Sequence, residues 1–344
     1  LVFAACKGQT VTLTRDLAST ANSMHTLAVA GVRNAICVPV MQDGAVARCL
    51  YLDSLHSERA PEDDAAAFCA AVGELCALAL SNMRRARLEQ ERVRDAEQMQ
   101  AALDIQRGIL PPATGAFGPV SYAMHVQPGK QVSGDLFDIF DLGEGRVGFF
   151  VGDVTGKGVP AAILAATTQS YLAAALRYHA CPAKAVTLVN QHLCLRTAGQ
   201  KFVTLWCGIV DVAKRVMHCV DAGHGYAMLV PPGADAHPIE TVGGLPLRVG
   251  EDPYERAEIP IPPGSRIVLY SDGVAEQPAH ERPGAGKNDK REQFGQDRVV
   301  RTLRASTDPA SDVESLIAAV QTFAGIKRGE PLADDLTVAS IRIG

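Results

Sequence analysis

Acidic residues recur at points where this chain is expected to leave a β-strand. A carboxylate at a strand end is held rigidly, and a neighbouring glycine leaves room for a metal ion or water to approach the backbone. One such aspartate alone is more often a turn residue bonded to its own backbone. Several together indicate a site for Mg²⁺ or Mn²⁺, which prefer oxygen ligands. Four segments carry the pattern: Ser133-Gly134-Asp135, Gly152-Asp153-Val154, Ser271-Asp272-Gly273 and Ala333-Asp334-Asp335.

The second of these segments continues into a glycine-rich loop. The loop reads GDVTGKGVP over residues 152–160, follows an apolar stretch at 147–151 and precedes an expected helix. This is also the setting of a phosphate-binding P-loop. That motif requires four residues between its first glycine and Gly-Lys-Ser/Thr, whereas Lys157 is followed by Gly158. The spacing therefore argues against a nucleotide hydrolase.

Residues 152–160, with Asp135 upstream, resemble the metal-dependent serine/threonine phosphatases of the PPM type (type 2C). The branch they resemble is that of stage II sporulation protein E, the SpoIIE/RsbU-like branch. The resemblance covers about residues 101–343, and its segments keep their order over that length, which makes it specific. The further matching segments are Ile105-Gln106, Leu110-Pro111, Phe202-Val203-Thr204, Ala222-Gly223-His224, Tyr270-Ser271-Asp272-Gly273, Phe294-Gly295 and Asp334-Asp335-Leu336-Thr337-Val338.

The elements expected after residue 112 agree with an α+β fold, because runs of strands with segregated helices favour α+β layers over a βαβ repeat. The resemblance implies the α-β-β-α sandwich of PPM phosphatases. In that fold two antiparallel sheets stack face to face, helices cover them outside, and a dinuclear metal centre lies at one edge. Expected strands are 120–126, 147–151, 203–210, 217–220, 226–230, 266–271 and 336–343, and expected helices are 160–178, 183–197, 297–305 and 310–324.

The resemblance also assigns ligands for two Mn²⁺ or Mg²⁺ ions. Asp153 would bridge both ions, and the carbonyl of Val154 would bind one of them. Asp272 and Asp334 would complete the coordination of the other ion, and Asp135 would bind a metal ion directly or through water. The implied set is Asp135, Asp153, Val154, Asp272 and Asp334.

Two cations at such a site would supply the chemistry of phosphate ester hydrolysis. Ions about 3.5–4 Å apart lower the pKa of a shared water toward neutrality and neutralise charge on the phosphoryl oxygens. Asp153 and Asp272 are the expected catalytic residues, acting through that water without a covalent intermediate. Asp138 and Asp335 are second candidates as ligands. His224 is either the acid that protonates the leaving oxygen or a turn residue, and the turn interpretation is favoured.

Two features depart from the common pattern of that branch. The first motif begins Ser133-Gly134 where two glycines are commoner, and no arginine suited to holding phosphate stands nearby, which leaves Lys130 as a weak candidate. The expected carboxylates are all present, and this argues against an inactive copy. Residues 277–293 are rich in Pro, Gly, Lys and Glu without periodic apolar residues, which predicts a mobile flap near the metals.

A different pattern occupies the beginning of the chain. Two apolar stretches within residues 35–53 flank Asp43-Gly44, which predicts a β-hairpin. Proline and acids then start a helix near residue 62, and no strong breaker interrupts it before Gly108. Residues 1–82 resemble the closing half of a GAF domain. Such domains bind small molecules or mediate dimer contacts, and dimerisation is the expectation here.

The part of this helix beyond Met83 is highly charged and is expected to be a linker. Its apolar positions fit an a/d seam only loosely, so a dimeric coiled coil and a single solvated helix fit about equally. The expected division is a partial GAF-like sensory or dimerisation domain at 1–82, a helical linker at 83–112 and a phosphatase domain at 113–344. A homodimer would form through the first two parts.

Composition sets limits on the class of protein. With 344 residues, 47% apolar and 21% charged, the chain fits two globular domains. A net charge of −5 without a basic stripe argues against nucleic acid as a partner. Nine cysteines without C-x-x-C spacing suggest a reducing cytoplasm, and no apolar run of about 20 residues predicts a membrane span. Because Leu1 begins inside an expected strand, the chain is expected to be cut from a longer one.

These expectations combine into one predicted function. The chain would be a cytoplasmic signalling phosphatase that hydrolyses phosphoserine or phosphothreonine on a regulatory protein, which the resemblance implies is an anti-sigma-factor antagonist. The alternative is a catalytically silent, phosphatase-like scaffold that binds a partner. Manganese-dependent release of phosphate from a phosphopeptide separates the two.

Overall fold

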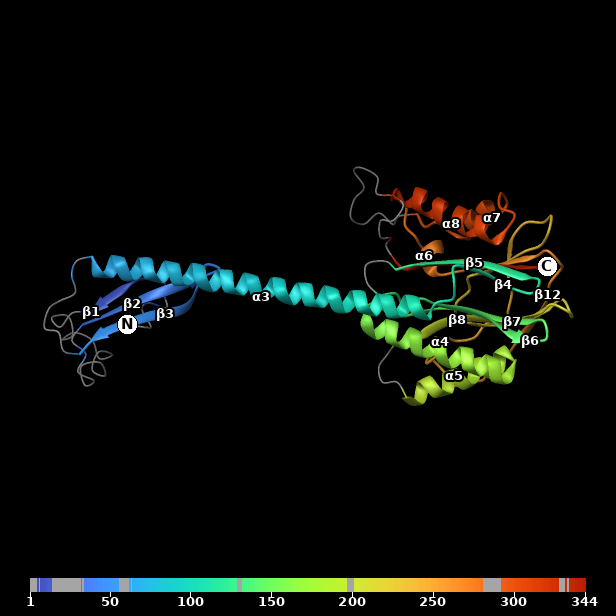
Figure 1. The fold of residues 1–344 in the computed structure, drawn as a ribbon, viewed down its shortest axis with the longest axis horizontal. Coiled ribbons are helices and arrows are strands. Elements are labelled where there is room, and N and C mark those ends of the chain that lie inside the picture. The colour runs from blue at the N-terminus through green and yellow to red at the C-terminus, as the bar shows by residue number, and fades with distance from the viewer. Residues whose placement is uncertain are drawn as a thin grey trace. The chain divides into compact units, whose positions relative to one another are not determined.

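The chain folds into two compact units, residues 1–97 and 98–344. Figure 1 shows the elements of each unit. The computed structural model describes residues 5, 7–13, 32, 34–55, 62, 64–128, 132–196, 201–280, 292–327, 332 and 334–344.

The first unit contains a three-stranded antiparallel sheet in the order β1-β2-β3. Its strands are β1 (Val11–Leu13), β2 (Asn34–Gln42) and β3 (Ala45–Ser54). Asp43 and Gly44 both have positive φ, 51° and 79°, as the tight turn between two antiparallel strands requires. The predicted hairpin is therefore confirmed.

Helix α3 (Ala65–Ile109) begins against this sheet and continues into the second unit. Cys69 packs in a small core with Ile36 and Val38. A Cβ atom on Gly73 would stand 2.6 Å from Val38 Cγ1, so glycine is needed for the close approach of helix and strand. The helix predicted from near residue 62 to Gly108 is confirmed, with its start three residues later.

Two helices contain an 18-residue window that is long and apolar enough to cross a membrane by length and composition. In α4 (Val159–His179) half of this window is buried inside the unit, as in the core helix of a globular domain. In α3 only 11% of the window is buried. Glu74 interrupts the apolar part of α3, so this part is not an uninterrupted apolar run.

The second unit contains a six-stranded sheet and a five-stranded sheet, both antiparallel. The six-stranded sheet has the order β11-β10-β13-β14-β5-β4, and the five-stranded sheet has the order β12-β9-β8-β7-β6. The strands are β4 (Thr114–Phe117), β5 (Val120–Gln127), β6 (Leu136–Gly143), β7 (Arg146–Val154), β8 (Val203–Asp211), β9 (Val216–Ala222), β10 (Ala227–Val230), β11 (His237–Pro238), β12 (Ala257–Pro260), β13 (Arg266–Tyr270) and β14 (Leu336–Ile343).

Three buried clusters show how the layers of this unit pack. One cluster joins the facing sides of the two sheets, with Tyr122 from one sheet and Phe149 and Trp206 from the other. A second joins the five-stranded sheet to α4 and α5 (Pro182–Arg196), and a third joins the six-stranded sheet to α7 (Gln296–Leu303) and α8 (Pro309–Ala324). The helices therefore cover the outer faces of two stacked sheets (Figure 1). The expected mixed α/β architecture is confirmed.

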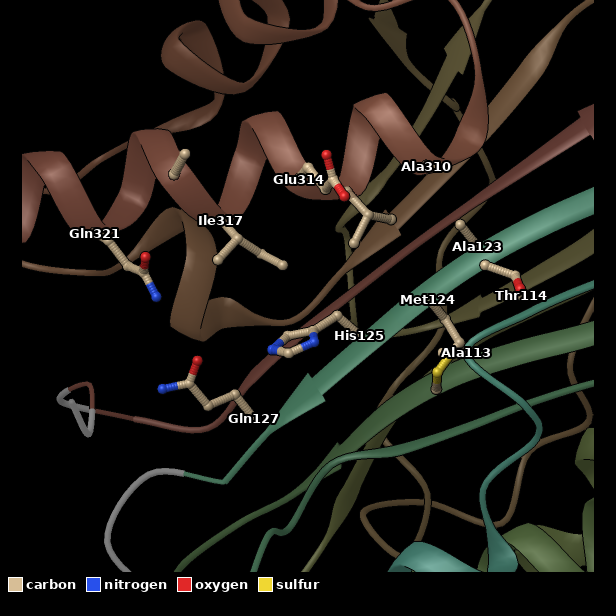
Figure 2. Close-up of a pocket in the computed structure, with 12 residues that line it drawn as sticks. Ala113, Thr114, Ala123, Met124, His125, Gln127, Ala310, Glu314, Ile317 and Gln321 are labelled. Carbon is tan, nitrogen blue, oxygen red and sulfur yellow. The ribbon is translucent and has the colours of Figure 1, made fainter. Parts of the chain in front are cut away.

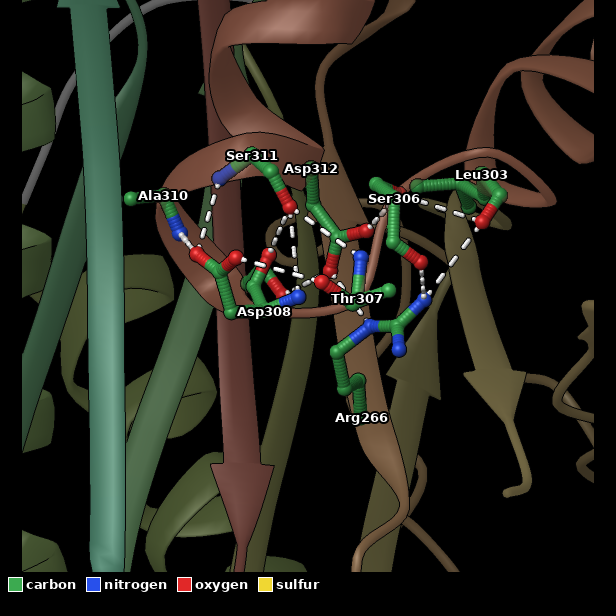
Figure 3. Close-up of polar contacts among 9 residues, drawn as sticks. Arg266, Leu303, Ser306, Thr307, Asp308, Ala310, Ser311 and Asp312 are labelled. Carbon is green, nitrogen blue, oxygen red and sulfur yellow. Dashed lines mark hydrogen bonds and ion pairs between the residues drawn. The ribbon is translucent and has the colours of Figure 1, made fainter. Parts of the chain in front are cut away.

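A buried ion pair fastens α8 to the six-stranded sheet. Arg266 of β13 donates from Nε to Asp312 of α8 at 2.8 Å, and the two side chains are only 11% and 0% exposed. Ser340 of β14 donates to the same carboxylate at 2.6 Å. Asp308 caps the helix, accepting from the backbone N–H of Ser311 at 3.1 Å (Figure 3). The anchor matters for the site because Asp272 follows β13 and Asp335 precedes β14.

Strands β1, β4, β6, β11 and β12 were not predicted. The sequence of β6, LFDIFDLG, separates apolar pairs with acids at a spacing of three, so it lacks the alternation of a half-buried strand. Its pairing with β7 and its burial against α4 come only from the assembled sheet. The other strands and helices predicted from residue 35 onward are present, with ends shifted by up to three residues. The strand expected at residues 1–6 lies, apart from Ala5, outside the described residues.

Candidate metal centre

The predicted aspartates lie at one edge of the stacked sheets. Asp153 is the penultimate residue of β7, and Asp272 starts the short helix α6 (Asp272–Ala275) directly after β13. Asp135 and Asp335 come just before β6 and β14, so the expectation that every segment follows a strand is wrong for these two. In an antiparallel sheet the start of one strand and the end of its neighbour share an edge. The register Leu136↔Gly152 accordingly places Asp135 next to Asp153.

Hydrogen bonds connect the two sheets at this edge. The backbone N–H of Gly134 donates to Asp335 Oδ2 at 2.8 Å. The Thr337 hydroxyl, from β14, donates to Asp135 Oδ2 at 2.5 Å. A Cβ atom on Gly134 would stand 2.8 Å from Asp153 Oδ1 and 2.9 Å from the Val154 carbonyl oxygen. Glycine therefore allows the carboxylates of both sheets, and this carbonyl, to come close together.

Burial and mutual repulsion raise the pKa values of these acids. Burial raises the pKa of Asp153 to about 7, and the charges of Asp272, Asp335 and Asp334 add to the rise. Burial also raises the pKa of Asp272 to about 6, with Asp334 as the largest charged contributor. The pKa of Asp135 is well above its usual range, because the carboxyl is buried and faces Asp153 and Asp335. The carboxylates therefore form one electrostatically coupled group.

Of the two second candidates, only Asp335 lies with the other acids; Asp138 does not. Asp335 belongs to the group, since it bonds to the Gly134 N–H and raises the pKa of both Asp135 and Asp153. Asp138 lies in β6, where burial raises its pKa to about 6 and the charge that acts on it is Arg177 of α4. It does not join the other acids.

Protein groups occupy several of these oxygens. Lys157, in the loop between β7 and α4, pairs with Asp334 Oδ1 at 2.9 Å. The same oxygen accepts from the Asp335 backbone N–H at 2.9 Å. Within the described part of the chain, no three acidic, histidine or cysteine side chains already stand in an arrangement that would hold a metal ion. The acids are gathered at one edge, but among the described residues they do not form a complete set of metal ligands.

The donor set nevertheless fits hard divalent cations. Asp135 is 3% exposed, and among the described residues its Oδ1 has no hydrogen-bond partner. A buried, unpartnered carboxylate oxygen is costly unless a cation or water satisfies it. The surrounding donors are carboxylates and a backbone carbonyl, which are the oxygen ligands of Mg²⁺ and Mn²⁺. Cations would also relieve the repulsion that raises the pKa values.

A small pocket of about 120 Å³ opens beside these acids, lined by Asp272, Gly273, Glu276, Gln277, Pro278 and Asp334. A cavity of about 600 Å³ lies elsewhere, between β5 and α8, where His125 and Ile317 face each other (Figure 2). None of the predicted aspartates lines that cavity. We therefore place the candidate site at the smaller pocket.

His224 is buried and lies away from the pocket lining. Its ring nitrogens contact Tyr270 O at 3.0 Å and Thr204 Oγ1 at 3.3 Å, and burial lowers its pKa to about 4. A neutral imidazole with both nitrogens engaged is a poor proton donor to a leaving group. This geometry argues against the proton-donor interpretation. Lys130 and most of the expected flap at 277–293 lie outside the described residues.

Two charged groups beside the site, Glu276 and Lys201, were not predicted. Glu276 directly follows α6, four residues after Asp272, and lines the pocket. Lys201 donates from Nζ to the Thr155 carbonyl at 2.8 Å. Lys157 was seen only as part of a glycine-rich loop. The spacing of Glu276 was a usable signal, whereas the position of Lys201 depends on the pairing of β7 with β8.

Comparison with known proteins identifies the family. The sequence profile described as stage II sporulation protein E (SpoIIE) matches residues 143–344. Protein IcfG of Synechocystis sp. is 22% identical over 271 residues, which is 71% of this chain and 41% of the relative. The phosphoserine phosphatase RsbP of Bacillus subtilis is 23% identical over 155 residues, 44% of this chain and 38% of the relative. The chain thus spans about two-fifths of the length of these relatives.

A solved structure supports the same assignment at the level of the fold. The SiaA-PP2C domain of Pseudomonas aeruginosa aligns with a TM-score of 0.61 at 21% identity, over 74% of this chain and 99% of that domain. The fold of the second unit is therefore that of a PP2C domain. The profile match covers more than half of the chain and confirms the resemblance found in the motifs. The chain belongs to the stage II sporulation protein E (SpoIIE) family.

Proposed function

We propose that this chain is a metal-dependent protein serine/threonine phosphatase. The observation that carries the proposal is the convergence of acids from both sheets on one edge, where burial and mutual repulsion raise the pKa of Asp153 to about 7. Such a concentration of negative charge is unstable without cations, and perturbed carboxylates of this kind mark functional sites. Membership of the family and the name of the relative RsbP, a phosphoserine phosphatase, support the same activity.

The residues that would hold the two divalent cations are Asp135, Asp153, the carbonyl of Val154, Asp272 and Asp334, with Asp335 as an alternative to Asp334. Bound Mn²⁺ or Mg²⁺ supplies a water of lowered pKa and neutralises charge on the phosphoryl group.

The chain itself contributes position and charge around the phosphate. Carboxylates on rigid strand ends keep the oxygen donors of two sheets at one edge. Lys157 is 57% exposed at this edge, so its ammonium can meet an approaching phosphate. Lys201, which bonds to the Thr155 carbonyl, adds a second positive charge to the same turn. These groups attract a phosphorylated side chain to an edge that is otherwise strongly acidic.

The proposed substrate is a phosphoserine or phosphothreonine residue of a regulatory protein in the cytoplasm, such as an anti-sigma-factor antagonist.

The proposed organisation is a GAF-like sensory or dimerisation part at 1–82, a helical linker at 83–112 and the phosphatase domain at 113–344. Homodimerisation is part of this proposal. Its support is the exposed apolar side chains on the first half of α3, where Phe68 and Met83 are each 70% exposed and Leu75 is 66% exposed.

The decisive experiment measures Mn²⁺-dependent phosphate release from a phosphoserine peptide. Asp153→Asn and Asp272→Asn should each lose at least about 100-fold in rate, because each removes several kcal/mol of charge stabilisation. Asp141→Asn is the matched control, since Asp141 is exposed in β6, away from the candidate site, and accepts a hydrogen bond from the local Gly143 N–H at 2.8 Å. Equal rates in the wild type and all three variants would contradict the proposal. The catalytically silent scaffold would then be the better hypothesis.

A further inference from the structure

His224 lies in the loop between β9 of one sheet and β10 of the other. Gly223 and Gly225 on either side have φ of 75° and 73°, which lets the loop turn sharply. The Asp221 carboxylate accepts from the backbone N–H of His224 at 2.7 Å and from that of Gly225 at 3.1 Å. The Asp221 carboxylate thus fixes the conformation of the loop. The His224 side chain points into the protein and is only 5% exposed.

The hydrogen bonds of the imidazole define its tautomer. A backbone carbonyl can only accept, so Nε2 carries the hydrogen and donates to the Tyr270 carbonyl at 3.0 Å. Nδ1 is then an acceptor, and the Thr204 hydroxyl, 3.3 Å away, shares its single hydrogen between Nδ1 and the Asp153 carbonyl oxygen at 3.4 Å. The titratable groups around the ring are Asp221, Tyr226, whose ring meets the imidazole edge to face at 5.5 Å, and Tyr270. The burial that lowers the pKa of His224 keeps this arrangement neutral.

Each partner of His224 stands next to a predicted metal ligand. Thr204 is directly opposite Asp153 in the β7–β8 ladder, and its Oγ1 lies 3.4 Å from the Asp153 carbonyl oxygen. Tyr270 ends β13, two residues before Asp272. One ring therefore bonds to the five-stranded sheet beside Asp153 and to the six-stranded sheet beside Asp272.

The connection through His224 holds the two sheets together where the charges of Asp153 and Asp272 repel each other. The negative charge of Asp272 disfavours the charged form of Asp153 and contributes to the rise in the pKa of Asp153. The sheets that carry them meet mainly through apolar side chains, whose contacts are not directional. Two hydrogen bonds from a rigid ring fix a separation in a way that apolar packing does not.

We propose that His224 is a positioning residue that sets the separation of Asp153 and Asp272 across the two sheets and thereby the affinity of the site for a divalent cation. The inference rests on the proposed function for the identity of the ligands. It assigns His224 neither the role of a proton donor nor that of a residue needed only for the turn.

The test is a calorimetric titration of the whole chain with Mn²⁺ alone, well below the unfolding temperature. His224→Ala removes both bonds and should raise the dissociation constant for Mn²⁺ about tenfold. This lies within the range found when groups that orient metal ligands are lost. Thr204→Val removes only the Nδ1 partner and should raise the constant less. His224→Gln can still donate to Tyr270 O and should recover part of the affinity. His218→Ala, a change of the same type in neighbouring β9, should leave it unchanged.

A pH profile of phosphate release separates positioning from acid catalysis. At limiting Mn²⁺, His224→Gln should release phosphate more slowly than wild type. At saturating Mn²⁺ the two rates should be equal, and the dependence of the rate on pH should have the same shape in both proteins. Wild-type affinity in folded His224→Ala, or loss of the alkaline limb in His224→Gln, would overturn the inference. If His224→Ala does not fold, wild-type affinity in both Thr204→Val and His224→Gln overturns it equally. Wild-type protein that binds Mn²⁺ but releases no phosphate would overturn the proposed activity and leave the comparison of affinities intact.

Discussion

Lys157 pairs with Asp334 at 2.9 Å, so the glycine-rich loop after β7 reaches the segment before β14. The pair joins the two sheets at the candidate metal centre. The Asp334 bond is also the largest cause of a raised pKa for Lys157, so the side chain stays charged across the physiological range. A lysine ammonium and a divalent cation would compete for this carboxylate.

Replacing Lys157 should therefore strengthen cation binding. Both side chains are about half exposed, 57% and 47%, so the pair is worth at most about 1 kcal/mol. Lys157→Gln should tighten Mn²⁺ binding by no more than about fivefold at low ionic strength, and the gain should shrink with added salt. Calorimetry measures it, with Lys214→Gln as the control because Lys214 pairs with Asp211 elsewhere at 3.0 Å. Weaker binding in Lys157→Gln would show that the lysine holds Asp334 in place.

Gly273 is predicted to tolerate no side chain. A Cβ atom there would stand 1.8 Å from the Asp335 carbonyl oxygen, so the segment before β14 would have to move. Gly273→Ala should cost about 1–3 kcal/mol of unfolding free energy and weaken Mn²⁺ binding. Gly108→Ala is the matched control, since no atom lies within 4 Å of its Cβ position. Denaturant unfolding followed by the fluorescence of Trp206, the single tryptophan, measures both, and equal stability would contradict the steric argument.

The stability of the second unit should fall as pH rises when EDTA is present. The pKa values of Asp153, about 7, and Asp272, about 6, lie above the ordinary value near 3.9. Between about pH 4 and 7 the folded protein thus keeps protons that the unfolded chain has released, and stability decreases over this window and levels off above it. The unfolding free energy at pH 8 should be lower than at pH 5 by on the order of 4 kcal/mol, about two pH units from Asp153 and one from Asp272 at about 1.4 kcal/mol each.

Asp153→Asn provides the control for this pH dependence. The variant should have a smaller slope between pH 4 and 7 and greater stability than wild type at pH 8, because it removes one of the repelling charges. Part of the slope should remain, since burial also raises the pKa values of Asp272 and Asp138 to about 6. Identical pH curves for the two proteins would contradict the assignment of Asp153 as a strongly perturbed acid.

The buried pair of Arg266 and Asp312 should dominate the attachment of α8. Asp312→Ala leaves an uncompensated charge beside β13, and removing one partner of a buried pair costs about 3–5 kcal/mol. Asp235→Ala breaks the exposed pair with Arg304, whose side chains are 59% and 57% exposed, and should cost less than about 1 kcal/mol. Urea unfolding of both variants tests the difference. A cost below 1 kcal/mol for Asp312→Ala would mean that the apolar contacts of α8 suffice.

Much of the fold could be predicted from short-range sequence patterns. Strand β14 has the predicted bounds, 336–343, because a short run rich in β-branched and apolar residues directly after two acids is a local signal. The hairpin at Asp43-Gly44 follows from turn chemistry alone. Strand β6 was not readable, since its acids interrupt the alternation and its place between β7 and solvent depends on pairing.

For the candidate site, the sequence by itself determined which carboxylates to consider and the family of phosphatases they resemble, since motif identity and order are properties of the chain. Only the tertiary structure decided that Asp335 joins the group while Asp138 does not, that Lys157 reaches Asp334, and that His224 connects the strands next to Asp153 and Asp272. The physical reason is range. Turn preference and periodicity act over a few residues, whereas these contacts join residues up to 201 positions apart and depend on the register of two stacked sheets.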